Sequence, residues 1–190
     1  MHDTILTQPA ATQGLRHDRT TIALHWTTAV LVAVLWGIGQ TIDIFPNGPL
    51  RIDYRSIHIV CGVLLGVVLV ARLTWRLTRR QSLPPIDHGA LLFIARFTHW
   101  LLYALLVVAV GLGVAYLWVR GDSIFNLFQI PAFDPDPANR RALSHQIGGW
   151  HALAANTILI VAGLHAAAAL IHHFVLRDAT LTRMLPWRSR

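Results

Sequence analysis

Long runs of hydrophobic residues dominate the chain. Four of them, at about residues 21–42, 56–77, 93–119 and 150–176, contain few or no charged side chains. A helix needs about 20 apolar residues to cross the hydrocarbon core of a bilayer, and each run reaches that length. The pattern therefore predicts an all-α, integral membrane protein, a bundle of four transmembrane helices.

The segments between these runs are polar and rich in turn-forming residues. Proline and glycine interrupt residues 43–55 and 79–89, and residues 120–146 form the longest link. Residues 1–20 are polar and lack the short apolar core of a cleavable signal peptide. We therefore interpret residues 21–190 as a single transmembrane domain that follows a polar tail.

The composition excludes an ordinary soluble domain and several kinds of redox centre. Hydrophobic residues make up 54% of the chain and charged residues only 13%, whereas soluble domains carry roughly 25% charged residues. The single cysteine, Cys61, excludes an internal disulfide, an iron–sulfur cluster held by this chain alone and a covalently attached haem.

Arginine alone carries the basic charge. The formal net charge is +7, with sixteen arginines, nine aspartates and neither lysine nor glutamate. Nucleic-acid-binding proteins are also basic, but these arginines gather at the ends of the hydrophobic runs. Eleven fall on the side that holds both termini, and five fall on the other side with five aspartates. This bias predicts cytoplasmic termini and an outward-facing third link, and no nucleic-acid partner is expected.

Histidines inside the hydrophobic runs are the candidate functional residues, because an ionisable side chain at membrane depth is costly and marks a functional site. His25 lies early in the first run and His58 early in the second. The fourth run holds His151 near its start and His165 fourteen residues later. That spacing corresponds to about 21 Å along a helix and nearly four full turns, so both side chains leave the same helix face.

These histidines match in depth as two pairs. Because successive helices run in opposite directions, His58 and His151 share one depth and His25 and His165 share another. Each pair is suited to hold one flat macrocycle between two helices. Haem fits best, since two histidine ligands leave the iron no open position and favour electron transfer. Zinc requires three or four clustered ligands, so the pattern predicts two haem b groups instead.

Each of these features has an alternative explanation. Gly62 and Gly66 follow His58 on its helix face and would admit a macrocycle, but small residues also serve close helix packing. An intramembrane histidine can instead form a hydrogen bond between helices or act in a proton relay. His99 is a rival ligand in the third run, which we place beside a haem because the pairing leaves it no partner.

Two further histidines, His172 and His173, end the fourth run at the predicted cytoplasmic interface. His172 lies one heptad beyond His165, where a quinone head group would meet a haem edge and take up protons. The alternative is an interfacial histidine that binds lipid head groups.

The arginines near the predicted haems have two explanations. They could pair with haem propionates, or they could reflect membrane topology and contacts with lipid phosphates, which explain them equally well. The candidates for pairing with haem propionates are Arg72 and Arg76 inside, and Arg51 and Arg55 outside.

Several segments resemble the bacterial cytochrome b561 family. They are His25-Trp26, residues 56–62 (Ser-Ile-His-Ile-Val-Cys-Gly) and residues 149–151 (Gly-Trp-His). The most specific is Gly-Leu-His-Ala-Ala-Ala-Ala-Leu-Ile-His-His-Phe at residues 163–174, which continues to Pro186. The resemblance covers the chain after about residue 20 and is strongest to members that oxidise superoxide.

The resemblance implies a multi-pass protein of the bacterial inner membrane with four helices and two haem b groups. His58 and His151 would match the outer haem ligands, and His25 and His165 the inner ones. His172 would match a position near the quinone. Superoxide would give its electron to the outer haem at the periplasmic face, and two such electrons would reduce ubiquinone.

Three functions follow as hypotheses, and membrane lipid is a partner in all of them. The first is an enzyme, a superoxide:quinone oxidoreductase. The second is an electron-carrier subunit that links a periplasmic dehydrogenase or hydrogenase, its redox partner, to the quinone pool. The third is a histidine-based transporter or proton channel, which the regular pairing disfavours. The sequence assigns no catalytic residue.

Overall fold

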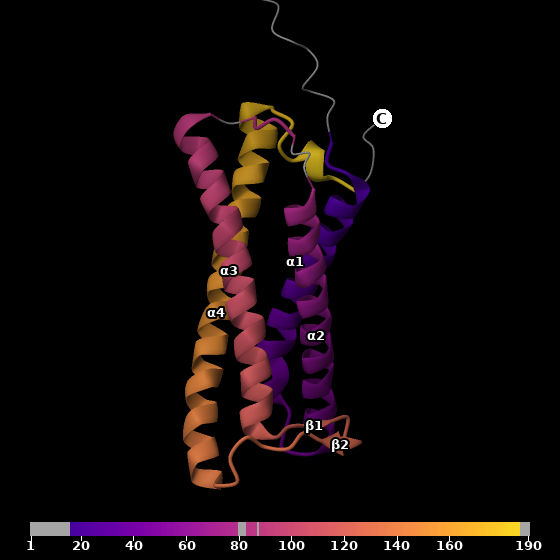
Figure 1. Cartoon of the computed structure of the whole chain (residues 1–190), viewed down its shortest axis with the longest axis vertical. Coiled ribbons are helices and arrows are strands. Elements are labelled where there is room, and N and C mark those ends of the chain that lie inside the picture. Colours follow the sequence, from indigo (N-terminus) through magenta and orange to yellow (C-terminus); the bar gives the residue numbers. More distant parts are fainter. Residues whose placement is uncertain (1–15, 80–82, 87, 187–190) are drawn as a thin grey trace, which may run out of the picture.

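The structure is a bundle of four long helices. A computed structural model describes residues 16–79, 83–86 and 88–186, and Figure 1 shows their arrangement. The helices are α1 (Arg19–Thr41), α2 (Pro49–Thr78), α3 (Gly89–Arg120) and α4 (Pro137–Ile171). All four are long and apolar enough to cross a membrane. The predicted all-α membrane bundle is therefore confirmed.

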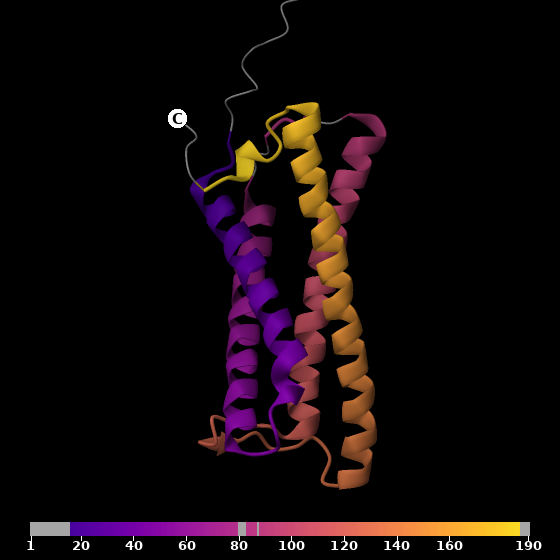
Figure 2. The same ribbon diagram turned by 180° about the vertical axis from the view of Figure 1, so that it is seen from behind.

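The bundle has two distinct ends. The first and last described residues lie together at one end, which we call the terminal end (Figures 1 and 2). The other end carries a small β-hairpin between α3 and α4, and we call it the hairpin end. Most of the predicted polar tail, residues 1–20, lies outside the described residues.

The helices pack as two pairs rather than as four equal neighbours. α1 packs mainly against α2, and α3 packs mainly against α4, whereas α1 and α4 touch at few points. A small core at mid-depth joins the pairs. Its buried residues are Leu35, Leu65, Leu69, Tyr103, Leu106, Ala109, Ala154 and Ile158. Large apolar side chains elsewhere on the helices point outward, as expected where lipid is the solvent.

All four helices begin before their hydrophobic runs, and the difference is largest for α4 and α2. α4 starts at Pro137, where the Asp136 side chain accepts a hydrogen bond from the Ala138 backbone N–H. α2 starts at Pro49. Proline suits the first helical position because its missing N–H has no partner there anyway. Hydrophobicity marks only the part of a helix that lies in lipid, so it missed these polar first turns.

The predicted third link, residues 120–146, is therefore partly helical. Its irregular part, residues 121–136, contains β1 (Ser123–Ile124) and β2 (Phe128–Gln129), which pair in antiparallel fashion. The Ser56 side chain of α2 is fully buried beneath this hairpin. Its hydroxyl accepts a hydrogen bond of 2.8 Å from the Phe125 N–H, which anchors the hairpin to α2.

The chain after α4 folds back across the terminal end. A π-helical turn (His172–Leu176) is followed by a 3₁₀ turn (Thr182–Met184). The Trp26 indole N–H donates to the Met184 carbonyl at 2.8 Å, and the buried Arg183 donates to the Pro84 carbonyl at 2.8 Å. These bonds tie the C-terminal segment to α1 and to the link before α3.

Candidate functional site

The four predicted ligand histidines lie together as two pairs. At the hairpin end, the ring centroids of His58 on α2 and His151 on α4 are 6.2 Å apart. Toward the terminal end, those of His25 on α1 and His165 on α4 are 6.4 Å apart. Helix α4 thus contributes one histidine to each pair.

Both spacings suit one metal atom between two imidazole rings. A metal–imidazole bond is about 2 Å long, so two such bonds in line keep the ring centres about 6 Å apart. Among the described residues, no group of three or more histidine, cysteine or acidic side chains could hold a metal. The two histidines of each pair therefore fit a metal ion that a macrocycle already holds and that takes only two ligands from the protein.

At the hairpin end a backbone carbonyl lies against each of the two rings. His151 Nδ1 lies 3.0 Å from the Ala109 carbonyl, which only an N–H can satisfy, so its Nε2 is unprotonated and able to bind a metal. His58 Nδ1 is buried, and the backbone carbonyl of Leu35 on α1 interacts with the same ring. Each ring thus has a backbone carbonyl partner on another helix, as metal-binding histidines usually have.

Two glycines that the sequence analysis missed face these rings. A Cβ at Gly39 would lie 3.5 Å from His58 Cε1, and a Cβ at Gly113 would lie 3.2 Å from His151 Cε1. Gly62, by contrast, faces open space, and Gly66 faces a valine on α3. The sequence alone does not identify these two glycines, because Gly39 and Gly113 lie on different helices from the histidines that they face.

A cavity of about 500 Å³ opens beside the hairpin-end pair. Its volume falls within the range of about 300–1,000 Å³ that is typical of cofactor sites. His58, His151, Gly39 and Gly113 all line it, and most of the remaining lining is aliphatic. The residues present at this end therefore fit a haem.

Charged residues gather at the mouth of this cavity. Asp122, only 9% exposed, accepts from Arg55 at 3.0 Å and from Arg120 at 3.2 Å through the same carboxylate oxygen. Arg120 also donates to the Tyr116 hydroxyl at 3.1 Å. Arg51, the other predicted outer arginine, pairs with the exposed Asp43, which also lines the cavity. Three arginines and two aspartates therefore gather here, which leaves an excess of one positive charge.

The terminal-end pair is surrounded by cations. Arg72 lies 2.9 Å from His25 Nδ1 and, like Arg76, stacks on the ring of Tyr103. A guanidinium can only donate, so His25 Nδ1 accepts and the ring proton lies on Nε2. Metal binding through His25 Nε2 therefore requires Arg72 to turn away from the ring. None of the ion pairs between described residues includes Arg72 or Arg76.

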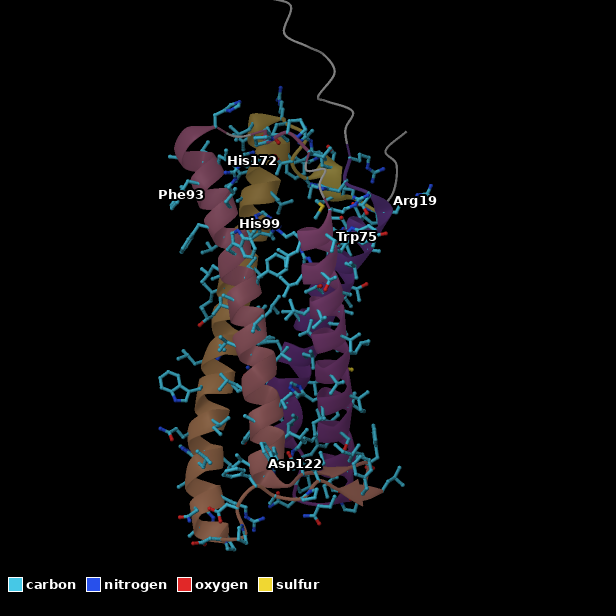
Figure 3. The ribbon with its side chains drawn as sticks, in the orientation of Figure 1. Arg19, Trp75, Phe93, His99, Asp122 and His172 are labelled. Atoms are coloured by element: carbon cyan, nitrogen blue, oxygen red, sulfur yellow. The ribbon has the colours of Figure 1, made fainter. Side chains whose placement is uncertain are left out.

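His99 also belongs to this cluster. Its ring centroid lies 5.0 Å from that of His165, which is less than the spacing of either pair above. Its Nδ1 is 2.6 Å from the carbonyl of Ala95 on its own helix, and this contact orients the ring. Figure 3 labels His99 toward the terminal end of the bundle. The shorter spacing suits a neighbour of the metal-binding pair rather than a member of it.

His172 lies nearer to the terminal end (Figure 3) and has a carboxylate partner. Its Nδ1 is 2.5 Å from Asp178 Oδ2, and Asp178 Oδ1 accepts from the Thr180 N–H at 2.8 Å. Burial raises the pKa of Asp178, but hydrogen bonds from Thr180 and His172 outweigh it and hold that pKa below its usual value. Asp178 and Thr180 occur in the segment that carries the family resemblance, but their contact with His172 was not predicted.

Comparison with known proteins identifies the family. Residues 16–187 match the family model of prokaryotic cytochrome b561. The chain belongs to the prokaryotic cytochrome b561 family. The predicted membership is confirmed, and cytochrome b561 proteins are membrane electron carriers that bind haem b. This assignment also supports the predicted location as a multi-pass protein of the bacterial inner membrane, where lipid surrounds it.

Individual cytochrome b561 relatives cover nearly the whole chain. The chain is 34% identical over 172 residues to the probable superoxide oxidase CybB of Yersinia pestis, covering 87% of this chain and 93% of that protein. It is 30% identical to cytochrome b561 homolog 1 of Escherichia coli, covering 92% and 99% of the two chains. It is 27% identical to cytochrome b562 of Cereibacter sphaeroides, covering 92% and 98%.

Proposed function

We propose that this chain is a di-haem cytochrome b that oxidises superoxide at the hairpin end and reduces ubiquinone at the terminal end. The observation that carries the proposal is the presence of two histidine pairs at two depths, each with the spacing of one metal. His58 and His151 would hold one haem, and His25 and His165 the other. Each haem, when bound, supplies one-electron transfer.

The charges at the hairpin end favour a small anionic electron donor. Around the mouth of the cavity three arginines outnumber two aspartates, and excess positive charge raises the local concentration of an anion such as superoxide. The relative from Yersinia pestis, named a probable superoxide oxidase, supports the same donor. Two superoxide anions would each lose one electron and leave as oxygen. One ubiquinone would take both electrons and two protons to form ubiquinol.

The terminal end offers a proton-handling residue for that reduction. Because Asp178 accepts at Nδ1 of His172, the ring keeps a proton there and presents Nε2 for exchange. We assign His172 to the ubiquinone site, where Nε2 would bind the quinone carbonyl and pass a proton to it. Asp178 acts on the quinone only through His172, by fixing the orientation of its ring.

The cations around the terminal-end pair suit the propionates of a haem. Arg72 and Arg76 have no carboxylate partner among the described residues, and a desolvated cation is stabilised by a nearby anion. A propionate that paired with Arg72 would draw the guanidinium from His25 Nδ1. That movement would let His25 carry its proton on Nδ1 and bind iron through Nε2.

The arginine distribution supports the direction of electron flow. Among the described residues, eight arginines belong to segments at the terminal end and five to segments at the hairpin end, so the terminal end would face the cytoplasm. The hairpin end would then face the periplasm. Labelling of a unique cysteine on each side of intact spheroplasts tests this orientation directly.

The haem content of the purified chain tests the two histidine pairs. We expect two haem b groups per chain by the pyridine haemochrome assay, and one group in each of His58→Ala and His25→Ala. His88→Ala is the matched control, because His88 is exposed at the start of α3. A colourless protein, or full haem content in both ligand variants, contradicts the proposal.

Superoxide-driven reduction of ubiquinone tests the activity. The purified chain in nanodiscs receives superoxide from an enzymatic source, and ubiquinol is measured with and without superoxide dismutase. We expect dismutase-sensitive reduction that falls to background in His58→Ala. Two haems without such activity would favour the alternative, an electron-carrier subunit for a periplasmic dehydrogenase or hydrogenase. The relatives from Escherichia coli and Cereibacter sphaeroides are named as cytochromes, which supports electron transfer in general.

A further inference from the structure

The hairpin between α3 and α4 carries no charge where a water-facing loop usually would. Residues 123–133 read Ser-Ile-Phe-Asn-Leu-Phe-Gln-Ile-Pro-Ala-Phe, an uncharged run of which seven are apolar, not counting the proline. This run lies outside the four transmembrane helices. Neither the histidine pairs nor the charged mouth of the cavity accounts for it.

The apolar side chains of this hairpin point away from the protein. Leu127 is 83% exposed, Phe128 is 59% exposed and Phe133 is 58% exposed. Phe133 packs edge-on against Trp118 on α3, with ring centroids 5.2 Å apart. A tryptophan beside exposed apolar groups at the end of a transmembrane helix is typical of the membrane interface.

The turn at the hairpin tip is strained and firmly held. Phe125 and Asn126 have φ of 49° and 56°, in the left-handed region that a bulky side chain such as phenylalanine rarely adopts. Such strain persists only where surrounding contacts enforce it. Here the Phe125 N–H donates to Ser56, and the Asn126 amide donates to Asp53 at 2.8 Å. The structure thus holds Leu127 and Phe128 outward at the expense of backbone strain.

These contacts also place the tip at the depth of the lipid head groups. The tip bonds to Pro49, Asp53 and Ser56, which all lie in the first turns of α2. Helix α2 has 30 residues, about 20 suffice to cross the hydrocarbon core, and the charged residues Arg51, Asp53 and Arg55 all fall in its first turns. Its first turns therefore lie in the head-group region. Figure 1 shows the hairpin projecting sideways past α2 rather than away from the end of the bundle.

We propose that the hairpin tip, formed by Phe125, Leu127 and Phe128, is embedded in the boundary between head groups and acyl chains of the leaflet at the hairpin end. Its partner is the phospholipid surface. The surface is continuous with the lipid-facing side of α2, where Ile57 and Val60 are also exposed. Contact with lipid buries the apolar tip and compensates for the strained turn.

This anchor has a consequence for the neighbouring histidine pair. Ser56, which receives the tip, lies two residues before His58, so the hairpin would hold this part of α2 at a constant depth. The charged mouth formed by Arg55, Arg120 and Asp122 remains beside the anchor and open to a small donor. The tip itself would not be available to a soluble protein partner.

Cysteine labelling of the haem-loaded chain in phosphatidylethanolamine–phosphatidylglycerol nanodiscs tests the anchor. In a Cys61→Ser background, Leu127→Cys and Phe128→Cys are compared with Ala138→Cys, at the exposed start of α4, and Val67→Cys, on the lipid-facing side of α2. A water-soluble maleimide reacts with the thiolate, which does not form in apolar surroundings. All thiols are counted after denaturation, and the haem spectrum verifies folding.

We expect both tip cysteines to react at least about fivefold more slowly than the Ala138→Cys site and to resemble the Val67→Cys site. Because Leu127 is 83% exposed, the protein itself does not shield this position. A difference of less than about fivefold from the Ala138→Cys site overturns the proposal. The tip would then face water and offer a surface to a soluble partner. Neither result depends on the electron donor or acceptor.

Discussion

The two histidine pairs differ in how the protein surrounds them. The hairpin-end pair borders an aliphatic cavity, with glycines against both rings and arginines at its mouth that are already paired with Asp122. The terminal-end pair lies among Arg72, Arg76 and a third histidine, without a carboxylate partner for either arginine among the described residues.

This difference indicates that the two sites depend on a bound cofactor to different degrees. At the hairpin end, glycines leave space beside both rings, and each arginine at the mouth has a carboxylate partner within the chain. The terminal end keeps cations in a low-dielectric region, where they are costly until an anion joins them. A haem would therefore contribute more to the folding of the terminal end than to that of the hairpin end.

The largest effect should come from filling the space beside one ring at the hairpin end. In Gly113→Val, the added side chain collides with His151, since even a Cβ there lies 3.2 Å from the ring. We expect this variant to lose one haem while the terminal-end haem remains, by haemochrome assay and spectrum. Gly111→Val is the control, because Gly111 faces open space on the same helix. Equal haem content in the two variants would show that His151 does not need this space.

A smaller effect is expected from the charge at the mouth of the cavity. Arg55→Gln leaves Asp122 paired with Arg120 and removes the positive excess. Superoxide-driven ubiquinone reduction should fall about tenfold at low ionic strength and less at high ionic strength, as steering weakens. Arg141→Gln, with the same change in net charge, should change the rate little because Arg141 is exposed at the start of α4 and does not line the cavity. A rate loss independent of salt would argue against steering.

The smallest effect concerns the Asp178 carboxylate at the terminal end. Hydrogen bonds hold its pKa below the usual value in the folded chain, so its ionised form contributes stability at neutral pH. That contribution is present above the unfolded pKa, about 4, and is lost as the pH falls through the lower folded pKa. Asp178→Asn should therefore lower the melting temperature at pH 7 but flatten its decline below about pH 4. Asp134→Asn, at the hairpin end, is the control, and identical pH profiles would exclude this linkage.

The sequence by itself determined the features that depend on local pattern. Hydrophobic length specifies four helices, because a membrane span requires a nearly continuous apolar run. Both His151 and His165 lie on one helix, so helical periodicity alone places them on one face and about 21 Å apart. The family resemblance followed from the same local segments, and the family comparison confirmed it.

Only the tertiary structure decided the features that depend on how helices meet. Gly39 and Gly113 contact histidines on other helices, and Asp122 joins arginines from α2 and α3. Neither the hairpin within residues 120–146 nor its hydrogen bond to Ser56 was predicted from the sequence. Such contacts depend on the rotation and depth of each helix relative to its neighbours. A single sequence specifies the apolar face of a helix but not the partner that this face meets.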